Sequence, residues 1–327
     1  MKVVLIASEC VPYCKTGGLA DVTRALFDEL YAQGIDVHLM LPYYKGISAR
    51  DISSTEVNFD ISVGEGVYNV RVFKSGRVYF IYNKELFYRD GIYGYNGDYQ
   101  DNDLRFAFFC KAALLALKRL SLNPDVLHLH DWQTAPVSVF LKNSFQNDKY
   151  YRKIRTVLTI HNLGYQGIFD RRALYLLDLD DSMFTPEYLE FYGKVNFLKG
   201  GILFSDVITT VSRKYAEEIL SEEYGFGLHG VLRKRKKALY GIINGIDYSV
   251  WSPENDPFLY SSYSEENLKG KGLCKLALLK ELGFSPGRNI PVFAFIGRLT
   301  TQKGLDLIEG ALDMLVDKKC RVVILGE

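Results

Sequence analysis

The chain has 327 residues, of which 48% are hydrophobic and 24% charged, and its formal net charge is +1 at pH 7. One hydrophobic core rarely serves so long a chain, so two domains are expected. The nearly balanced charge argues against binding to nucleic acid or to an anionic membrane. No apolar run reaches the ~18 residues of a membrane span, and the short apolar stretch before Glu9 predicts a first strand instead of a secretory signal.

The first forty residues predict a βαβ unit. Residues 2–8 form a nearly continuous apolar run, as expected of a strand buried on both faces. Apolar residues then recur at helical spacing over 19–30, Gly34 ends the helix, and residues 36–41 form the next strand. Such a unit implies a parallel sheet.

Residues 57–82 alternate with period two and predict an antiparallel meander inserted into the α/β pattern. The α/β pattern then resumes. The expected helices are 103–120, 132–141 and one that begins at Ser212, and the expected strands are 125–129, 156–160 and 207–210.

Residues 252–266 are rich in turn formers, so the domain boundary is placed at about residue 240. Beyond it the pattern predicts a helix, a strand, a helix and a strand, at 268–282, 292–296, 305–315 and 321–325. The expected fold class is α/β with two Rossmann-like, doubly wound domains, in residues 1–240 and 241–327. The second has too few strands to cover both sheet faces, so we expect the chain to end inside it.

Two segments join a strand to a helix in a way that suits a phosphate. In Lys15–Asp21, Gly17 and Gly18 allow a close backbone approach at a helix start, and Lys15 adds a charge; a glycine turn with a surface lysine is the alternative. In Gly297–Gly304, Arg298 can form two hydrogen bonds to a phosphate and Lys303 supplies a compact charge. A ligand between the two domains is therefore expected.

The basic run Arg233–Lys237 is interpreted as a solvated helix end, with a patch facing an anionic ligand as the alternative.

Polar residues also follow two buried strands, at His128–Trp132 and at His161-Asn162. This edge of an open α/β sheet faces the ligand crevice. His128 and His130 lie on one side of their strand, but no third metal ligand is evident. Asp131 and His161 fit better as groups that orient a substrate hydroxyl. Asn244 lies in an Asn-Gly turn that has a structural interpretation as well.

Five cysteines without a C-x-x-C pair favour free thiols and a cytoplasmic location; they are Cys10, Cys14, Cys110, Cys274 and Cys320. The sequence has no G-x-x-x-x-G-K-[ST], no G-x-S-x-G and, after the first strand, no G-x-G-x-x-G. A P-loop NTPase, an α/β-hydrolase and a dehydrogenase therefore have no support.

Collinear motifs along the whole chain resemble those of the bacterial glycogen synthase and plant starch synthase family. They are K-T-G-G-L-A-D-V at 15–22, H-D-W at 130–132, T-I-H-N-L-x-Y-Q-G at 159–167, F-L-K-G-G-I at 197–202, N-G-I-D at 244–247, W-S-P at 251–253 and G-R-L-T-x-Q-K-G-L-D at 297–306. The resemblance implies a two-domain, Rossmann-like (GT-B) glycosyltransferase that transfers glucose from ADP-glucose to the non-reducing end of an α-1,4-glucan with retention of configuration and without a metal.

The resemblance also implies roles for individual residues. The catalytic set would be His161, Asp131, Arg298 and Lys303. The substrate-binding set would be Lys15, Gly17, Gly18, Asp21, Tyr95, Asn162, Asn244 and Gln302. His161 would hold the transferred glucose, Asp131 would lie beside the acceptor, and Tyr93 is the alternative to Tyr95 beside the donor.

The family carries a later glutamate motif, E-x-C-G-L-T, that this sequence lacks. We therefore expect the 327-residue chain alone to be inactive. A UDP-glucose-dependent transferase and an inactive fragment that binds glucan or nucleotide are the alternative hypotheses.

Overall fold

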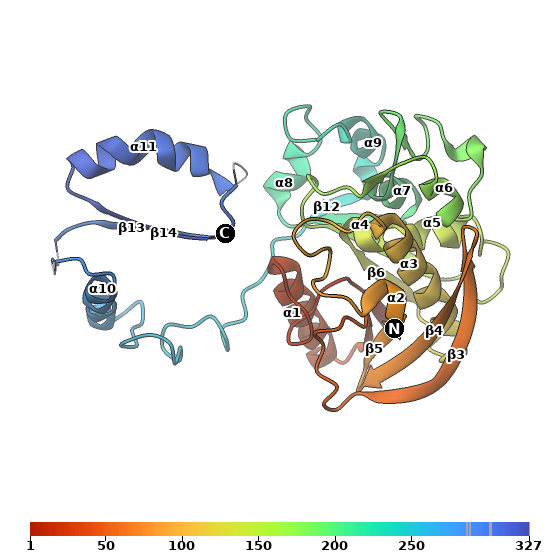
Figure 1. Cartoon of the computed structure of the whole chain (residues 1–327), viewed down its shortest axis with the longest axis horizontal. Helices are drawn as coiled ribbons and strands as arrows, with labels where there is room; N and C mark the ends of the chain where they lie inside the picture. Colours follow the sequence, from red (N-terminus) through yellow and green to blue (C-terminus); the bar gives the residue numbers. More distant parts are fainter. Residues whose placement is uncertain (286, 288, 301–302, 327) are drawn as a thin grey trace. The chain divides into compact units, whose positions relative to one another are not determined.

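The computed structural model describes residues 1–285, 287, 289–300 and 303–326. Contacts divide the chain into two compact units, Met1–Gly245 and Ile246–Glu327, and each is described by itself. Figure 1 shows the elements of both units. The first unit is described without a gap, so its sheet can be followed strand by strand.

The first unit is built on a nine-stranded sheet within residues 1–245, in the order β12-β11-β7-β6-β1-β2-β5-β4-β3. Its strands are β1 (Lys2–Ile6), β2 (Asp36–Pro42), β3 (Ser53–Val63), β4 (Gly66–Ser75), β5 (Val78–Tyr82), β6 (Val126–His130), β7 (Arg155–Ile160), β11 (Val207–Thr210) and β12 (Leu239–Gly241). All neighbours from β12 to β5 are parallel. The predicted α/β class with a parallel sheet is confirmed.

The predicted meander is present and begins at Ser53, four residues earlier than the alternation indicated. β3 pairs antiparallel with β4, and β4 with β5, whereas β5 lies parallel to β2. The first residues of β3 are exposed or half-buried, so the sequence there has no alternation of apolar and polar residues that would indicate a strand. β3 and β4 are the long strands at the edge of the sheet in Figure 1.

Helices flank this sheet, and α5 packs against both α3 and α7. The helices of the first unit are α1 (Gly18–Ala32), α2 (Lys84–Phe87), α3 (Asn102–Arg119), α4 (Asp131–Thr134), α5 (Pro136–Lys142), α6 (Ala173–Leu176), α7 (Phe197–Phe204), α8 (Arg213–Glu218) and α9 (His229–Lys234), with short 3-10 turns at Asp181–Met183 and Lys236–Ala238. The single helix expected over 132–141 is wrong. Pro136 has no backbone N–H to continue α4, so it begins α5 instead.

A second, three-stranded sheet was not expected from the sequence. It consists of β8 (Ile168–Phe169), β10 (Lys194–Asn196) and β9 (Glu190–Phe191), paired antiparallel in that order. The strands are only two or three residues long, which is too short for an alternation pattern to stand out. This sheet joins the segment after β7 to the start of α7.

The glycines of the F-L-K-G-G-I segment let α7 approach its neighbours closely. A Cβ atom at Gly201 would lie 2.5 Å from Cβ of Ala135 and 2.9 Å from Cδ2 of Leu158. Lys199, also buried, donates from Nζ to the carbonyl oxygens of Pro186 (2.7 Å) and Glu190 (2.5 Å). This motif therefore has a packing role in the first unit.

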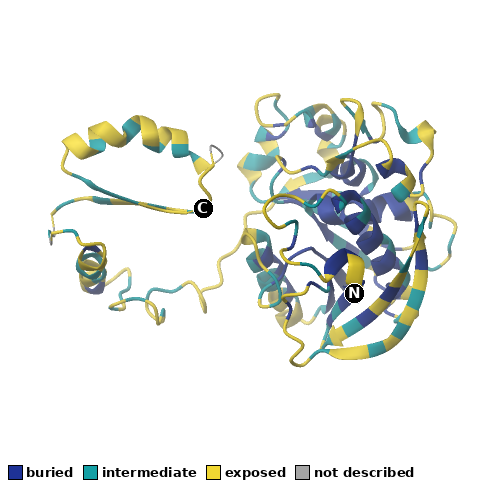
Figure 2. Cartoon of the chain, in the orientation of Figure 1, coloured by how far each residue is buried: buried dark blue, intermediate teal, exposed yellow. Residues whose placement is uncertain are grey.

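The second unit contains α10 (Lys269–Glu281), β13 (Val292–Ile296), α11 (Leu305–Asp317) and β14 (Arg321–Leu325), and its two strands pair in parallel. These elements lie where the periodicity predicted them. Figure 2 shows the core of the first unit buried, whereas the second unit is mostly exposed or half-buried. No helix among the described residues has the length and apolar character needed to cross a membrane.

Candidate active site

The predicted site residues of the first unit gather at one edge of the sheet. The chain runs from β1 to β2 on one side and later adds β6 on the other side of β1, so the strand order reverses at this point. In an open α/β sheet, ligands bind outside the carboxyl ends of the strands at such a reversal. The segments that follow β1, β6 and β7 are therefore the ones to consider.

Glu9 organises the segment that follows β1. Its carboxylate is buried and accepts hydrogen bonds from the backbone N–H of Thr16 (2.5 Å), the hydroxyl of Thr16 (2.7 Å) and the backbone N–H of Gly17 (3.2 Å). A fourth bond comes from the hydroxyl of Tyr93 (2.5 Å), which also bonds Ser8 (2.8 Å). Two backbone amides of the glycine turn are thus already bound by the protein's own carboxylate.

The rest of the glycine turn is exposed. Gly17 is the N-cap of α1 and Gly18 its first residue, and a Cβ atom at either would meet nothing within 4 Å. The fold itself therefore does not require glycine here, which leaves the close approach of a ligand as a reason for it. Lys15 lies beside this turn and pairs with Asp21 at 2.7 Å, so its charge is held at the start of α1.

Tyr93 and Tyr95 have different environments. Tyr93 is the one that reaches Glu9, and burial followed by the Glu9 charge raises the pKa of its hydroxyl well above the usual value. Tyr95 is 70% exposed. The structure therefore brings Tyr93 to the glycine turn and leaves the ring of Tyr95 in solvent.

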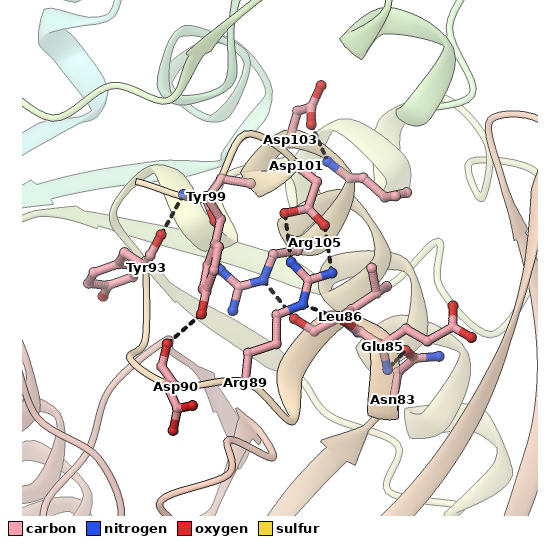
Figure 3. A network of polar contacts seen from close by, with 12 residues as sticks. Asn83, Glu85, Leu86, Arg89, Asp90, Tyr93, Tyr99, Asp101, Asp103 and Arg105 are labelled. Carbon is pink, nitrogen blue, oxygen red and sulfur yellow. Dashed lines mark hydrogen bonds and ion pairs between the residues drawn. The ribbon is translucent and has the colours of Figure 1, made fainter. Parts of the chain in front are cut away.

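A buried arginine fixes the loop that carries both tyrosines (Figure 3). The guanidinium of Arg105 is fully buried and donates to the carbonyl oxygen of Leu86 at 2.7 Å. It also donates to the carbonyl oxygen of Ile92 (3.0 Å) and to the side chain of Asn102 (2.6 Å). Asn102 in turn donates to the carbonyl oxygen of Tyr93 at 2.9 Å. These bonds connect α3 to the Tyr93 loop and, through it, to Glu9.

Three imidazoles lie at the carboxyl ends of β6 and β7. The ring centroids of His128 and His130 are 4.5 Å apart, those of His130 and His161 are 5.3 Å apart, and both pairs are stacked. Nδ1 of His130 is 3.0 Å from Nε2 of His161. Each of these two nitrogens is hydrogen-bonded to the other, and no group of three side chains that could hold a metal ion occurs among the described residues.

Asp131 fixes the backbone after β7. Its carboxylate accepts the backbone N–H of His161 at 2.7 Å and that of Asn162. Burial raises the pKa of this carboxyl above its usual value, although these contacts act in the opposite direction. Asp131 also has a φ of +56°, a conformation uncommon for residues other than glycine and often found at functional sites.

The remaining predicted residues come from the segments after β7 and β12 and from the second unit. Asn162 accepts the backbone N–H of Gly164 at 3.0 Å, and Asn244 is exposed beyond the end of β12. In the second unit Arg298 follows β13 and Lys303 is exposed just before α11, while Gln302 lies outside the described residues.

The basic run contributes to packing. Arg233 donates to the carbonyl oxygen of Leu220 at 2.6 Å, and Arg235 donates to that of Ser205.

Sequence reasoning missed Glu9 and gave His130 no role. The available signal for Glu9 was a carboxylate placed directly after a buried strand. For His130 it was the spacing of two histidines on one strand, which was considered only for metal binding.

Residues 2–234 match the family model of the starch synthase catalytic domain. The glycogen synthase of Geotalea daltonii is 45% identical over 100% of this chain and 69% of its own length. That of Thermodesulfovibrio yellowstonii is 44% identical over 97% of this chain and 68% of its own length. A solved structure, the catalytic domain of Starch Synthase IV from Arabidopsis thaliana bound to ADP and acarbose, matches with a TM-score of 0.89 and 34% identity over 99% of this chain and 68% of that chain.

The fold, the glycine turn and these similarities define a glycosyltransferase. The chain belongs to the glycogen synthase and starch synthase family, as the motifs predicted, and spans a little over two thirds of the length of these relatives.

Proposed function

We propose that this protein transfers glucose from ADP-glucose to the 4-hydroxyl at the non-reducing end of an α-1,4-glucan, with retention of configuration. The bond between C1 of glucose and the diphosphate breaks and ADP leaves. A bond from C1 to the acceptor oxygen forms, and the acceptor hydroxyl loses its proton. The observation that carries the proposal is His161, held by Asp131 through its backbone N–H and by His130 through its ring, at the carboxyl edge of a glycogen synthase sheet.

The donor diphosphate is assigned to the cationic and glycine-rich segments. Gly17 and Gly18 offer an uncrowded helix start, and the Lys15–Asp21 pair keeps a cation beside it. Arg298 and Lys303 would stabilise the charge that develops on the leaving diphosphate, the function that a divalent metal performs in other transferases. This assignment includes no metal cofactor.

The glucose unit is assigned to the segment after β7. His161 and Asn162 would orient its hydroxyls, and Asn244 would help to shape the pocket. Asp131, which already fixes both backbone amides of that segment, would lie near the acceptor glucan. The exposed ring of Tyr95 would flank the donor. Five free cysteines favour the cytoplasm as the place of the reaction.

The donor is tested with the product of the complete gene, assayed for incorporation of radiolabelled glucose into glycogen from ADP-glucose and from UDP-glucose. Incorporation mainly from ADP-glucose, into product that an α-1,4-specific hydrolase digests, supports the proposal. A preference for UDP-glucose would show that UDP-glucose, and not ADP-glucose, is the donor. Glycogen binding without incorporation from either donor would mean that the protein binds glucan but does not catalyse transfer.

The diphosphate role is tested with Arg298→Ala. It should lower kcat/KM for the donor by at least ~2 kcal/mol of transition-state stabilisation, which is about 30-fold. Activity should also survive exhaustive chelation. A kcat/KM for the donor within twofold of the parent value would show that Arg298 does not stabilise the leaving diphosphate. Loss of activity on chelation, restored by one divalent ion, would show that the reaction needs a metal.

A further inference from the structure

The contact between His130 and His161 determines which ring nitrogen of each histidine carries the proton. His130 is fully buried at the end of β6, whereas His161 is half-buried after β7 and is the residue proposed to contact glucose. Their rings are nearly parallel, inclined by 27°, and a single hydrogen bond of 3.0 Å joins Nδ1 of His130 to Nε2 of His161. One of these nitrogens carries the proton and the other accepts it.

The position of the proton follows from the other nitrogen of His130. Burial, and then the neighbouring imidazoles, lower the pKa of His130 well below its usual value, so this ring is neutral and has one N–H. Its Nε2 is buried and has no hydrogen-bond partner among the described residues. A buried N–H without an acceptor is rarer and more costly than an unpaired lone pair. The proton of His130 therefore lies on Nδ1 and is donated to His161.

This assignment determines which donor His161 can present. Nε2 of His161 accepts the bond from His130 and therefore carries no proton, so the proton of the His161 ring lies on Nδ1. No described residue is hydrogen-bonded to that Nδ1. The backbone of the same residue is fixed independently, because its N–H is bound to Asp131.

We propose that His130 is a positioning residue that holds His161 in its Nδ1–H tautomer, so that His161 donates this N–H to a hydroxyl of the transferred glucose. The second half rests on the proposed function of His161, whereas the tautomer does not. His128 helps to fix the ring of His130, since the ring of His128 stacks on it and Nε2 of His128 lies 2.6 Å from the hydroxyl of Thr159.

The first experiment measures the tautomer directly. The chain has five histidines, so each imidazole signal in a ¹⁵N-histidine spectrum of the 327-residue protein can be assigned by single substitution. Long-range ¹H–¹⁵N couplings distinguish the two tautomers. We expect Nδ1–H for His161 in the unaltered protein and loss of that preference in His130→Phe. An Nε2–H tautomer in the unaltered protein would overturn the inference without any need for the variant.

The second experiment is kinetic and uses the product of the complete gene. His130→Phe keeps a ring in the stack but has no donor, whereas His130→Asn keeps an N–H near the place of Nδ1. Because misplacement of a contacting group can cost as much as ~100-fold, the phenylalanine variant should lower kcat at least ~10-fold with little change in KM for ADP-glucose. The asparagine variant should stay within ~3-fold of the parent.

Equal losses in both variants, with the tautomer unchanged, would mean that His130 serves only packing, and the inference would fail. His161→Ala separates this outcome from failure of the proposed function. If that variant retained full turnover, His161 would not contact the glucose, although its measured tautomer would still assign the proton of His130.

Discussion

Replacement of Glu9 should separate the effect of its shape from the effect of its charge. In Glu9→Ala, the backbone N–H groups of Thr16 and Gly17 and the hydroxyl of Tyr93 lose their acceptor. A hydrogen bond to a charged group contributes ~1.5–3 kcal/mol. The loss is smaller than the sum over these bonds, because the turn is exposed and its amides can bind water instead, and because Tyr93 keeps its hydrogen bond with Ser8. We therefore expect Glu9→Ala to lower the free energy of unfolding by about 2–3 kcal/mol.

Glu9→Gln should cost less, about 1 kcal/mol, because it loses charge assistance and keeps the geometry. The amide oxygen can accept both backbone N–H groups, and the amide N–H₂ can donate to the hydroxyls of Thr16 and Tyr93. Tyr93, which then no longer donates to residue 9, can donate its proton to Ser8 instead. Both variants should raise KM for ADP-glucose more than they lower kcat, since the loosened turn is the proposed donor contact.

Calorimetry and initial rates measure these effects. At ~2–4 °C per kcal/mol, Glu9→Ala should lower Tm by about 4–12 °C and Glu9→Gln by about 2–4 °C. Tyr95→Phe is the matched control, since its exposed ring should leave Tm unchanged. An unchanged Tm in Glu9→Ala, or a glutamine variant less stable than the alanine variant, would refute the reasoning.

Three further predictions concern the fold. Gly201→Ala should destabilise the protein in urea by about 1–3 kcal/mol through overpacking, whereas Gly230→Ala in α9, with open space at its Cβ, should stabilise it by about 0.5–1 kcal/mol; equal effects would contradict the close approach of α7. Burial lowers the pKa of His128 to about 4, so the unfolded chain binds the proton first and stability should be lost as pH falls from 6.5 towards 4. His128→Asn should reduce that slope in urea titrations, and an identical slope would contradict it. Limited proteolysis should leave Met1–Gly245 intact and cut the more exposed second unit first, whereas equal protection of both would count against this division.

The sequence by itself determined the class of the fold and the family. A strand such as β1 is a buried run of apolar residues, and a helix such as α1 repeats its apolar residues every three or four positions, so both are encoded locally. The site segments could be located because the βα rhythm places the ends of parallel strands at one edge. Collinear motifs then named the family.

Only the tertiary structure decided which groups touch. Glu9 and Tyr93 are 84 residues apart, and no periodicity relates them. The bond between His130 and His161 depends on the register of β6 with β7, in which His130 lies opposite Thr159, two residues before His161. A slip of one residue would turn the side chains of a strand to the opposite face. Local sequence sets which segments become strands, whereas the partner of each buried polar atom is chosen by packing between segments far apart in the chain.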